Sequence, residues 1–381
     1  MQKKAHLMEL EAPVLALGLM SGTSCDGVDL ALIRTDGEDA FEPVANGFHA
    51  YSADQKALLG QAIKAAKGME DRTDRSGVLA EAEALVTQHH IEAAQVFLDS
   101  LDENVSRPDL IGFHGQTVWH DPAKGVTVQL GDGEALSNIL NCPVVFDLRA
   151  NDMEHGGEGA PMVPAFHRLL AAKQELLRPC AFVNIGGVSN ITWIGSEDEL
   201  TAFDCGPGNA LIDDLVRRKL NKDMDEGGRL AMAGQVDFLA LVGLIGNPYF
   251  QKRAPKSLDR NAFDASVVES LGVEDAVATL TAFTVETICL GLEQMEQLKG
   301  EQPTCLVVCG GGQHNPAIIG QLQGALDCEV RRADDLGLQG DALEAQAFAY
   351  LAVRSSRGLP LTFPGTTGVH EPVSGGVMVG G

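Results

Sequence analysis

Two short apolar runs separated by a polar turn open the sequence and set its organisation. Val14 to Leu17 leads into the turn, and Val28 to Ile33 leads out of it. Both runs are rich in aliphatic or β-branched residues, which is typical of strands. The turn between them is made of glycine, serine, threonine and aspartate, with no large side chain at its centre. We therefore predict a strand–turn–strand hairpin over residues 14–34.

Beyond the hairpin, apolar residues recur either at helical steps or in short continuous runs. The helical spacing predicts helices over 53–67, 76–101, 273–299 and 341–352. The continuous runs predict strands at 109–117, 127–130, 142–147 and 304–309. Alternation of strands with helices indicates an α/β fold. The tail from Gly358 is predicted to be irregular.

A second strand–turn–strand pattern lies at 182–194, with Gly186 and Gly187 at its tip. Its likeness to the opening hairpin suggests a duplicated, two-domain architecture. Each half would then present one turn, and the two turns would face opposite sides of one polyphosphate. We expect an N-terminal domain over 1–147, joined by the C-terminal segment 345–381, and a C-terminal domain over 148–344.

The segment 155–161 is dense in glycine. A long segment of this kind near the expected domain boundary is interpreted as a domain junction or a lid. The alternative is a long connection without a function of its own.

The net charge, the cysteines and the apolar stretches of the sequence limit which partners and which cellular location we expect. The 381 residues carry a formal net charge of −25, which disfavours nucleic acids and anionic membranes as partners. The eight cysteines are scattered without a Cys-x-x-Cys pair, which fits reduced thiols in the cytoplasm. Residues 1–12 lack the apolar core of a signal peptide, and no uncharged stretch reaches membrane-spanning length.

The opening turn has the chemistry of a phosphate cradle. Its small residues let backbone N–H groups approach an anion closely, and Thr23 and Ser24 add hydroxyl donors. Asp26 and Asp29 supply carboxylates suited to Mg²⁺ or to its waters. The turn lacks the Gly-Lys-Ser/Thr of a Walker loop, and a strand follows it. The alternative is an ordinary hairpin with a glycine-containing turn.

Two further segments could contribute to a site. Asp204 follows an apolar run and precedes a Gly-Pro-Gly turn and a helix start, which suits a carboxylate at the mouth of a cleft. The alternative is a turn acid or helix cap without a chemical role. Gly310, Gly311 and Gly312 lie between a strand and a helix, where bare backbone suits the flat ring or ribose of an adenosine.

Six motifs in order across residues 18–348 resemble those of anhydro-N-acetylmuramic acid kinases. Each motif is weakly specific by itself, but the ordered set is highly specific. The motifs are Met20-Ser21-Gly22-Thr23-Ser24-x-Asp26-Gly27-Val28-Asp29, His114-Gly115-Gln116-Thr117, Asp147-x-Arg149-x-x-Asp152, Gly157-x-Gly159-Ala160-Pro161-x-Val163-Pro164, Asn184-Ile185-Gly186-Gly187 and Phe203-Asp204-x-Gly206-Pro207-Gly208-Asn209.

Three positions depart from the usual pattern of that family. Cys25 and Leu148 replace a common Leu and a common Phe at what we interpret as packing positions. Cys205 replaces a common Thr and so removes a hydroxyl beside Asp204.

The resemblance implies a two-domain, actin-like (ribonuclease-H-like) sugar-kinase fold with its active site in the cleft between the domains. It implies that ATP and Mg²⁺ are used to convert 1,6-anhydro-N-acetylmuramic acid to N-acetylmuramic acid 6-phosphate in peptidoglycan recycling. Water opens the anhydro bridge as the freed 6-oxygen takes the phosphoryl group. The family also suggests a cytoplasmic homodimer with a small amino sugar as its ligand.

The resemblance also assigns roles to single residues. Asp204 is the expected general base that activates water, and Glu344 is expected to assist near the water and the sugar. Sugar-binding residues are expected to be His114, Gln116, Arg149 and Asn209. Asp26 is the expected metal ligand, directly or through a water. Residues expected to bind ATP are Gly22, Thr23, Ser24, Cys25, Asp26, Gly27, Val28, Asp29, Gly186, Gly187, Gly206, Gly310, Gly311 and Gly312.

Two other functions are compatible with the same motifs. One is an actin-like kinase that phosphorylates another amino sugar without adding water to it. The other is an ATP-binding scaffold of the same superfamily without catalysis, because a fold does not fix a function. Release of ADP in the presence of the anhydro sugar, compared with free N-acetylmuramic acid or no sugar, distinguishes these alternatives.

Overall fold

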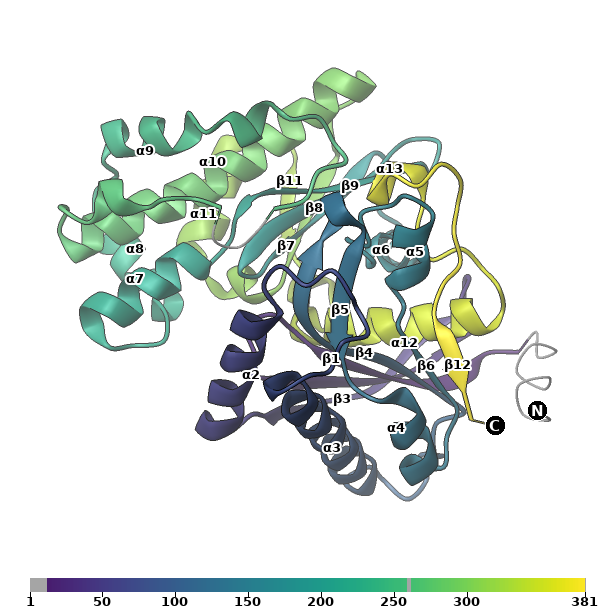
Figure 1. The fold of residues 1–381 in the computed structure, drawn as a ribbon. Helices are drawn as coiled ribbons and strands as arrows, with labels where there is room; N and C mark the ends of the chain where they lie inside the picture. Colours follow the sequence, from purple (N-terminus) through teal and green to yellow (C-terminus); the bar gives the residue numbers. More distant parts are fainter. Residues whose placement is uncertain (1–11, 259–261, 381) are drawn as a thin grey trace. The chain divides into compact units, whose positions relative to one another are not determined.

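The computed structural model describes residues 12–258 and 262–380, which form two compact units, each built around one β-sheet (Figure 1). Unit 1 runs to Leu169 and resumes at Ala342, whereas unit 2 is the continuous stretch Leu170–Asp341. The sequence placed these boundaries at 147/148 and 344/345. The first unit extends further because hydrogen bonds tie the segment after 147 to the C-terminal tail. Of residues 1–12, only residue 12 is among the described residues.

The sheet of unit 1 combines an antiparallel meander with parallel strands. Its order is β12-β6-β4-β1-β2-β3, with β5 paired to β4. Strands β1, β2 and β3 are antiparallel, while β4 runs parallel to β1 and β6 runs parallel to β4. The strands are β1 (Val14–Ser21), β2 (Gly27–Thr35), β3 (Phe41–Ala50), β4 (Leu110–Asp121), β5 (Val126–Leu130), β6 (Val144–Phe146) and β12 (Val377–Val379).

Unit 2 repeats this plan. Its sheet has the order β11-β10-β7-β8-β9, with β7, β8 and β9 antiparallel and with β10 and β11 added in parallel. The strands are β7 (Cys180–Ile185), β8 (Val188–Ile194), β9 (Leu200–Pro207), β10 (Cys305–Cys309) and β11 (Glu329–Arg332). A meander followed by parallel strands in both units is the arrangement expected of a duplicated, actin-like fold, and the predicted α/β class is confirmed.

The sheet of unit 1 is covered by helices on both faces (Figure 1). Strand β1 is buried along its whole length, as expected for a strand with no solvent-facing side. Leu15, Leu17 and Leu19 belong to one core with α2 and α3, while the alternate residues face α12. The helices of this unit are α2 (Ala53–Ala66), α3 (Val78–Asp99), α4 (Gly133–Leu140), α5 (Ala150–Glu154), α12 (Leu343–Ser356) and α13 (Pro364–Thr367), and α6 (Pro164–Lys173) spans the unit boundary.

Helix α12 approaches the sheet so closely that only glycine fits beneath it. A Cβ built on Gly18 of β1 would lie 1.8 Å from the carbonyl oxygen of Ala345, and one built on Gly112 of β4 would lie 2.2 Å from that of Phe348. Because the obstacle in both cases is backbone, no side-chain rotation can relieve it. These two glycines therefore fix the height of α12 above the sheet.

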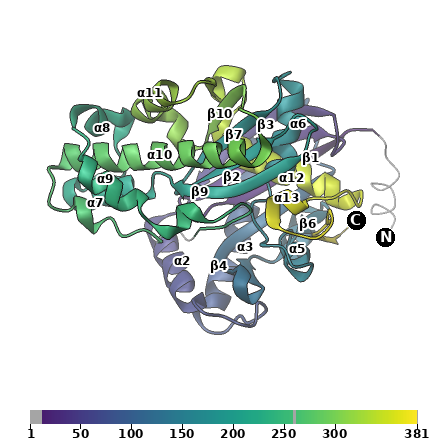
Figure 2. The same ribbon diagram turned by 90° about the horizontal axis from the view of Figure 1, so that it is seen from above.

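Unit 2 is organised around the long helix α10 (Val273–Lys299), which Figure 2 shows beside β9 and the helices α7, α8 and α9. By length and apolar composition α10 could cross a membrane, but 78% of its most apolar window is buried inside the structure, as in a core helix. The short pair α8–α9, bent by 115°, passes the same test only if it is counted as one span. The remaining helices are α7 (Ala210–Leu220), α8 (Arg229–Ala233), α9 (Phe238–Ile245) and α11 (Pro316–Ala325).

Replacement of Gly112 by alanine tests the contact between α12 and the sheet. We expect Gly112→Ala to lower the free energy of unfolding by about 1–3 kcal/mol or more, because overpacking forces the backbone apart. Chemical denaturation followed by circular dichroism measures the change. As the control, Gly60→Ala in α2, where a Cβ meets nothing within 4 Å, should stabilise the protein by roughly 0.5–1 kcal/mol. Equal stability of Gly112→Ala and wild type would contradict the contact.

Candidate functional site

The turn between β1 and β2 presents exposed polar groups on a small backbone. Thr23, Ser24 and Asp26 are exposed, while Cys25 is buried with a φ of 54°. The backbone N–H of Cys25 donates to the Gly22 carbonyl at 3.2 Å, which closes the turn. The Asp26 carboxylate accepts from the Ser24 hydroxyl at 2.8 Å and from the Gly27 N–H at 3.1 Å. The turn is thus held by its own side chains.

The two glycines of this turn serve different purposes. A Cβ on Gly27 would lie 2.5 Å from the carbonyl oxygen of His49, so this glycine is required by packing. A Cβ on Gly22 would meet only the Ser24 hydroxyl, at 3.6 Å, and Gly22 has no positive φ. The fold therefore tolerates a side chain at Gly22, and the absence of one leaves open backbone for a ligand.

A buried polar network supports the turn from below. The Ser21 hydroxyl donates to Gln116 Oε1 at 2.5 Å, and Gln116 Nε2 donates to the Gly22 carbonyl at 3.0 Å. Because the Ser21 hydroxyl gives its one hydrogen to Gln116, the Tyr51 hydroxyl is the donor in its 3.3 Å bond to Ser21. Burial raises the pKa of Tyr51 to about 12, which keeps this hydroxyl protonated. Because Gln116 is fully buried and both ends of its amide are engaged, its contacts favour a positioning role. Direct binding of sugar by Gln116 stays a prediction.

His114 and Arg149 form a pair next to this network. Arg149 Nε donates to His114 Nε2 at 3.1 Å, so the other ring nitrogen carries the proton and donates to the Gly115 carbonyl at 2.8 Å. Burial, with the Arg149 charge, holds the pKa of His114 well below its usual range, which keeps the imidazole neutral. His114 is only 5% exposed. We therefore interpret it as the residue that orients Arg149.

The glycine-rich loop at 155–161 is fastened within unit 1. Arg149 Nη1 donates to the Gly159 carbonyl at 2.8 Å, and the Gly159 N–H donates to the Asp152 carboxylate at 2.7 Å. Asp152 also accepts from the Thr367 hydroxyl at 2.7 Å, which joins the loop to the C-terminal tail. The unit boundary lies further along, after Leu169. These bonds give no support to the predicted lid or domain junction.

Glu344, the second expected catalytic residue, lies in the first turn of α12 and belongs to unit 1. The sequence had assigned it to the C-terminal domain. Its helix is the one fixed by Gly18 and Gly112, so the position of Glu344 relative to the opening turn depends on that contact. Its catalytic role stays a prediction.

Asp204, in unit 2, is held at three points by one distant segment. Its backbone N–H donates to the Lys256 carbonyl at 2.9 Å, and its backbone carbonyl accepts from the Tyr249 hydroxyl at 2.6 Å. Its carboxylate accepts from the Leu258 N–H at 2.8 Å. The helix that follows, α7, begins at Ala210 and has no side-chain cap. The contacts therefore favour a positioned carboxylate over a helix cap.

A bulge in β9 sets the direction of the Asp204 side chain. Asn190 of β8 pairs with Asp204, but the preceding residue, Ser189, pairs with Gly206, so Cys205 is the extra residue. Bulges of this kind re-aim side chains and are common beside active sites. The Cys205 thiol is buried in the core and donates to the Ser189 carbonyl at 3.2 Å. A side-chain hydroxyl at this position would therefore face the core.

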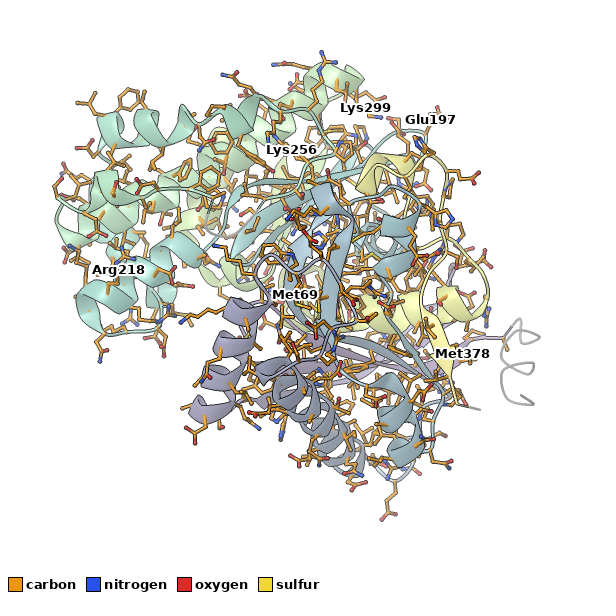
Figure 3. All side chains as sticks on the ribbon, viewed as in Figure 1. Met69, Glu197, Arg218, Lys256, Lys299 and Met378 are labelled. Carbon is orange, nitrogen blue, oxygen red and sulfur yellow. The ribbon has the colours of Figure 1, made fainter. Side chains whose placement is uncertain are left out.

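Lys256, which Figure 3 labels, adds a buried positive charge that interacts with Asp204, in a segment that the sequence did not single out. It is 7% exposed and lies 4.9 Å from the ring centroid of Tyr249. Its ammonium donates to Gln294 Oε1 at 3.2 Å. Burial lowers the pKa of Lys256, and the charge of Asp204 opposes that change.

Three glycine segments of unit 2 meet at one end of its sheet. The N–H of Gly208 donates to the Gly187 carbonyl at 3.0 Å, and that of Asn209 donates to the Gly186 carbonyl at 2.7 Å. Asn209 Nδ2 also donates to the carbonyl of Ile185 at 3.2 Å, so this side chain holds the β7–β8 turn. A Cβ on Gly311 would lie 3.5 Å from Asn209 Nδ2, which places the 310–312 turn beside them.

As in the β1–β2 turn, some of these glycines are required by packing and others have room for a side chain. A Cβ would collide with a neighbour at 2.1 Å on Gly206, 2.2 Å on Gly310 and 2.4 Å on Gly312, so these three are required by packing. Gly186 and Gly311 have room for a Cβ, with nearest atoms at 3.8 and 3.5 Å. Gly186 and Gly311 therefore leave backbone open to a ligand.

The residues present fit a nucleotide whose metal is held mainly by its phosphates. Among residues 12–258 and 262–380, no cluster of three His, Cys, Asp or Glu side chains could hold a metal ion by itself. Mg²⁺ commonly binds through one or two carboxylates together with substrate phosphates. Asp26 is an exposed carboxylate on a turn with open backbone and fits that mode.

Comparison with known proteins gives one consistent match. The family profile described as anhydro-N-acetylmuramic acid kinase matches residues 14–380. A protein of that name from Methylobacterium nodulans is 48% identical, covering 95% of this chain and 98% of that protein. Another from Agrobacterium fabrum is 44% identical, covering 96% and 98%.

Similarity to solved structures is much weaker. Component A of (R)-2-hydroxyglutaryl-CoA dehydratase from Acidaminococcus fermentans aligns with a TM-score of 0.43 at 14% identity, over 90% of this chain and 99% of that one. This likeness is too distant to add to the match in sequence.

Proposed function

Because this chain belongs to the anhydro-N-acetylmuramic acid kinase family, we propose that it converts 1,6-anhydro-N-acetylmuramic acid and ATP to N-acetylmuramic acid 6-phosphate and ADP. Water adds at the anomeric carbon, and the 6-oxygen released from the anhydro bridge takes the γ-phosphoryl group. The observation that carries the proposal is Asp204, whose backbone is held by Lys256 and Tyr249 and whose carboxylate is held by the Leu258 N–H, on a bulged strand near glycine turns open to a ligand.

The turn between β1 and β2 is proposed to bind the phosphates of ATP. Backbone N–H groups and the hydroxyls of Thr23 and Ser24 supply the donors, and open space at Gly22 lets the phosphates approach. Phosphoryl transfer depends on positioning and charge neutralisation more than on covalent chemistry. Mg²⁺, when bound, neutralises charge on the phosphates, and Asp26 would hold it directly or through a water. Gly186 and Gly311 leave the open backbone that the adenosine part requires.

Asp204 is proposed to accept a proton from the attacking water. A base held at its backbone and through its carboxylate keeps a fixed direction toward the water. The adjacent ammonium of Lys256 favours the ionised form that such a base needs. The requirement resembles that of the base in inverting glycosidases. Glu344 is proposed to assist near the water, and Arg149 to lie near the anionic sugar.

The biological setting follows from the proposed substrate. Anhydro-muramic acid is a product of cell-wall turnover, so the reaction belongs to peptidoglycan recycling. In the described part of the chain all eight cysteines are free thiols, and seven are buried, which fits the proposed cytoplasmic location. A homodimer is proposed from the family alone.

The nucleotide role of the opening turn is tested at Gly22. We expect Gly22→Leu to reduce ATP affinity at least about tenfold, because the side chain occupies the space of a phosphate, while the melting temperature stays close to wild type. Isothermal titration with an ATP analogue measures the affinity. The control is Gly320→Leu in α11, another position with room for a side chain, where a Cβ meets nothing within 4 Å. Unchanged affinity in folded Gly22→Leu would rule out the phosphate site.

The role of Asp204 is tested by Asp204→Asn, which keeps the shape but cannot take a proton. We expect turnover to fall by about 10² to 10⁴, the usual contribution of a general base, with sugar binding less affected. The matched control is Asp237→Asn in the same unit, where the carboxylate only caps α9. In ¹⁸O-labelled water, the wild-type product should carry label at the anomeric carbon. Near-normal turnover would exclude Asp204 as the base, and unlabelled product would favour a kinase that leaves its sugar unopened.

The electrostatic role of Lys256 is tested by the pH dependence of turnover. Removal of the ammonium in Lys256→Met makes the Asp204 carboxylate easier to protonate, so the acid limb of kcat should move to higher pH, by roughly one unit. Lys256→Arg, which keeps the charge, should restore the wild-type profile. A uniform loss of kcat with the acid limb in place would instead indicate that Lys256 only supports the fold.

A further inference from the structure

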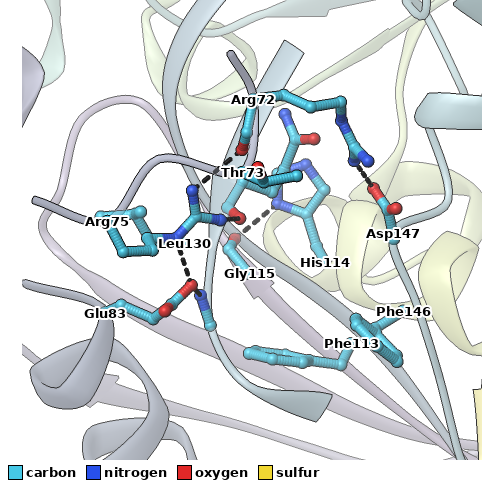
Figure 4. A pocket seen from close by; sticks show the side chains of 12 residues that line it. Arg72, Thr73, Arg75, Glu83, Phe113, His114, Gly115, Leu130, Phe146 and Asp147 are labelled. Atoms are coloured by element: carbon cyan, nitrogen blue, oxygen red, sulfur yellow. Dashed lines mark hydrogen bonds and ion pairs between the residues drawn. The ribbon is translucent and has the colours of Figure 1, made fainter. Parts of the chain in front are cut away.

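A pocket of about 270 Å³ in unit 1 lies where β4, β5 and β6 meet the loop between α2 and α3. Figure 4 shows Arg72 and Asp147 joined on one side of it, with Phe113 and Phe146 on another and His114 between. The carboxyl ends of parallel strands are the usual place for a ligand in an α/β unit. His114 also connects this pocket to Arg149, through the hydrogen bond described above.

Arg72 is held in place but keeps part of its guanidinium uncommitted. Its Nη2 forms an ion pair with the Asp147 carboxylate, and its Nε donates to the Thr127 carbonyl at 3.4 Å. Its side chain remains 35% exposed. Within the described part of the chain, no residue bonds to Nη1. A guanidinium that is already fixed along one edge can donate to a second carboxylate from its other edge at little cost in conformational entropy.

The neighbouring Arg75 has no guanidinium nitrogen without a hydrogen-bond partner. Its Nε donates to Glu83 at 2.6 Å, its Nη1 donates to the Arg72 carbonyl at 2.9 Å, and its Nη2 donates to the Gln129 carbonyl at 3.3 Å. All three nitrogens are therefore used to hold the loop that carries Arg72. This contrast assigns anion recognition to Arg72 and support to Arg75.

Asp147 orients Arg72 from a constrained position. Its φ of 54° lies in the left-handed region, which aspartate enters only with a local reason. Burial raises the pKa of Asp147, and the Arg72 charge opposes that rise. The pair thus depends on Arg72 remaining in place, and an arginine held by a carboxylate behind it presents its other edge to the pocket.

The pocket combines this cationic edge with an apolar wall. Phe113 and Leu130 are buried, and Phe146 is half-buried beside them. The substituent that distinguishes a muramic acid from a glucosamine is a lactyl ether, which carries one methyl group and one carboxylate. A methyl group suits the aromatic wall and a carboxylate suits Nη1 of Arg72. A protein of net charge −25 needs such a local cation to attract an anionic sugar.

We propose that this pocket binds the lactyl group of the sugar and that Arg72 selects muramic over glucosamine-type anhydro sugars by pairing with the lactyl carboxylate. The inference rests on the proposed function, because it assumes an anhydro-muramic acid as the substrate. It makes Arg72 a specificity-determining residue.

The test compares two sugars that differ only in the lactyl group, 1,6-anhydro-N-acetylmuramic acid and 1,6-anhydro-N-acetylglucosamine. The ratio of their kcat/KM values should fall about 10- to 100-fold in Arg72→Gln, the range expected for a charge-assisted hydrogen bond. The control is Arg107→Gln, which removes an exposed arginine from an ion pair with Asp99 and should leave the ratio as in wild type. An equal loss on both sugars, or an unchanged ratio, would overturn the inference.

A second experiment removes the negative charge from the lactyl group of the sugar and leaves the protein unchanged. Its result with wild type therefore does not depend on how a variant folds. The methyl ester of the lactyl group should be turned over by wild type about 10- to 100-fold less efficiently than the acid. In Arg72→Gln, or in Arg72→Lys if the former is unstable, this difference should shrink. An ester as good as the acid would overturn the inference. Wild type that acts on neither sugar would overturn the proposed function itself.

Discussion

Helix α12 lies against β1 and β4 with backbone in contact with backbone at Gly18 and Gly112, because neither residue carries a Cβ. The expected functional groups of unit 1 sit at the ends of these same elements. The turn proposed to bind phosphates follows β1, His114 and Gln116 are on β4, and Glu344 is in the first turn of α12. A shift of α12 by one methyl group would therefore move Glu344 relative to the turn. The packing of α12 on the sheet therefore also determines the geometry of these groups.

The sequence predicted the elements whose patterns are strong and missed those that depend on partners. The helices at 53–67, 76–101 and 273–299 and the two glycine hairpins are confirmed within a few residues. Strand β3 was missed because it lies at the sheet edge, has no fully buried residue and lacks an apolar alternation. The tail from Gly358 was predicted to be irregular, yet it contributes α13 and the strand β12, which pairs with β6. Such edge strands form because a neighbour offers free backbone groups, and no local pattern records this.

The candidate site shows the same division. The motifs pointed to Asp204, but nothing near it in sequence pointed to the segment that holds it, through the Tyr249 hydroxyl, the Lys256 carbonyl and the Leu258 N–H. Glycines were found as a class, but the sequence could not tell those required by packing, such as Gly27 and Gly312, from those that leave backbone open. That distinction depends on the atoms a Cβ would meet, which only the folded chain specifies.

The order of the units along the chain has a consequence for biosynthesis. Domains commonly fold from the N-terminus as they leave the ribosome. Here the first unit lacks α12 until residue 356 has been made, so one face of β1 and β4 stays uncovered while all of unit 2 is translated. Unit 2 has its last strand, β11, once residue 332 has been made. Unit 2, which is inserted in the sequence of unit 1, can therefore fold first. Unit 1 can complete its core only after α12 has been synthesised.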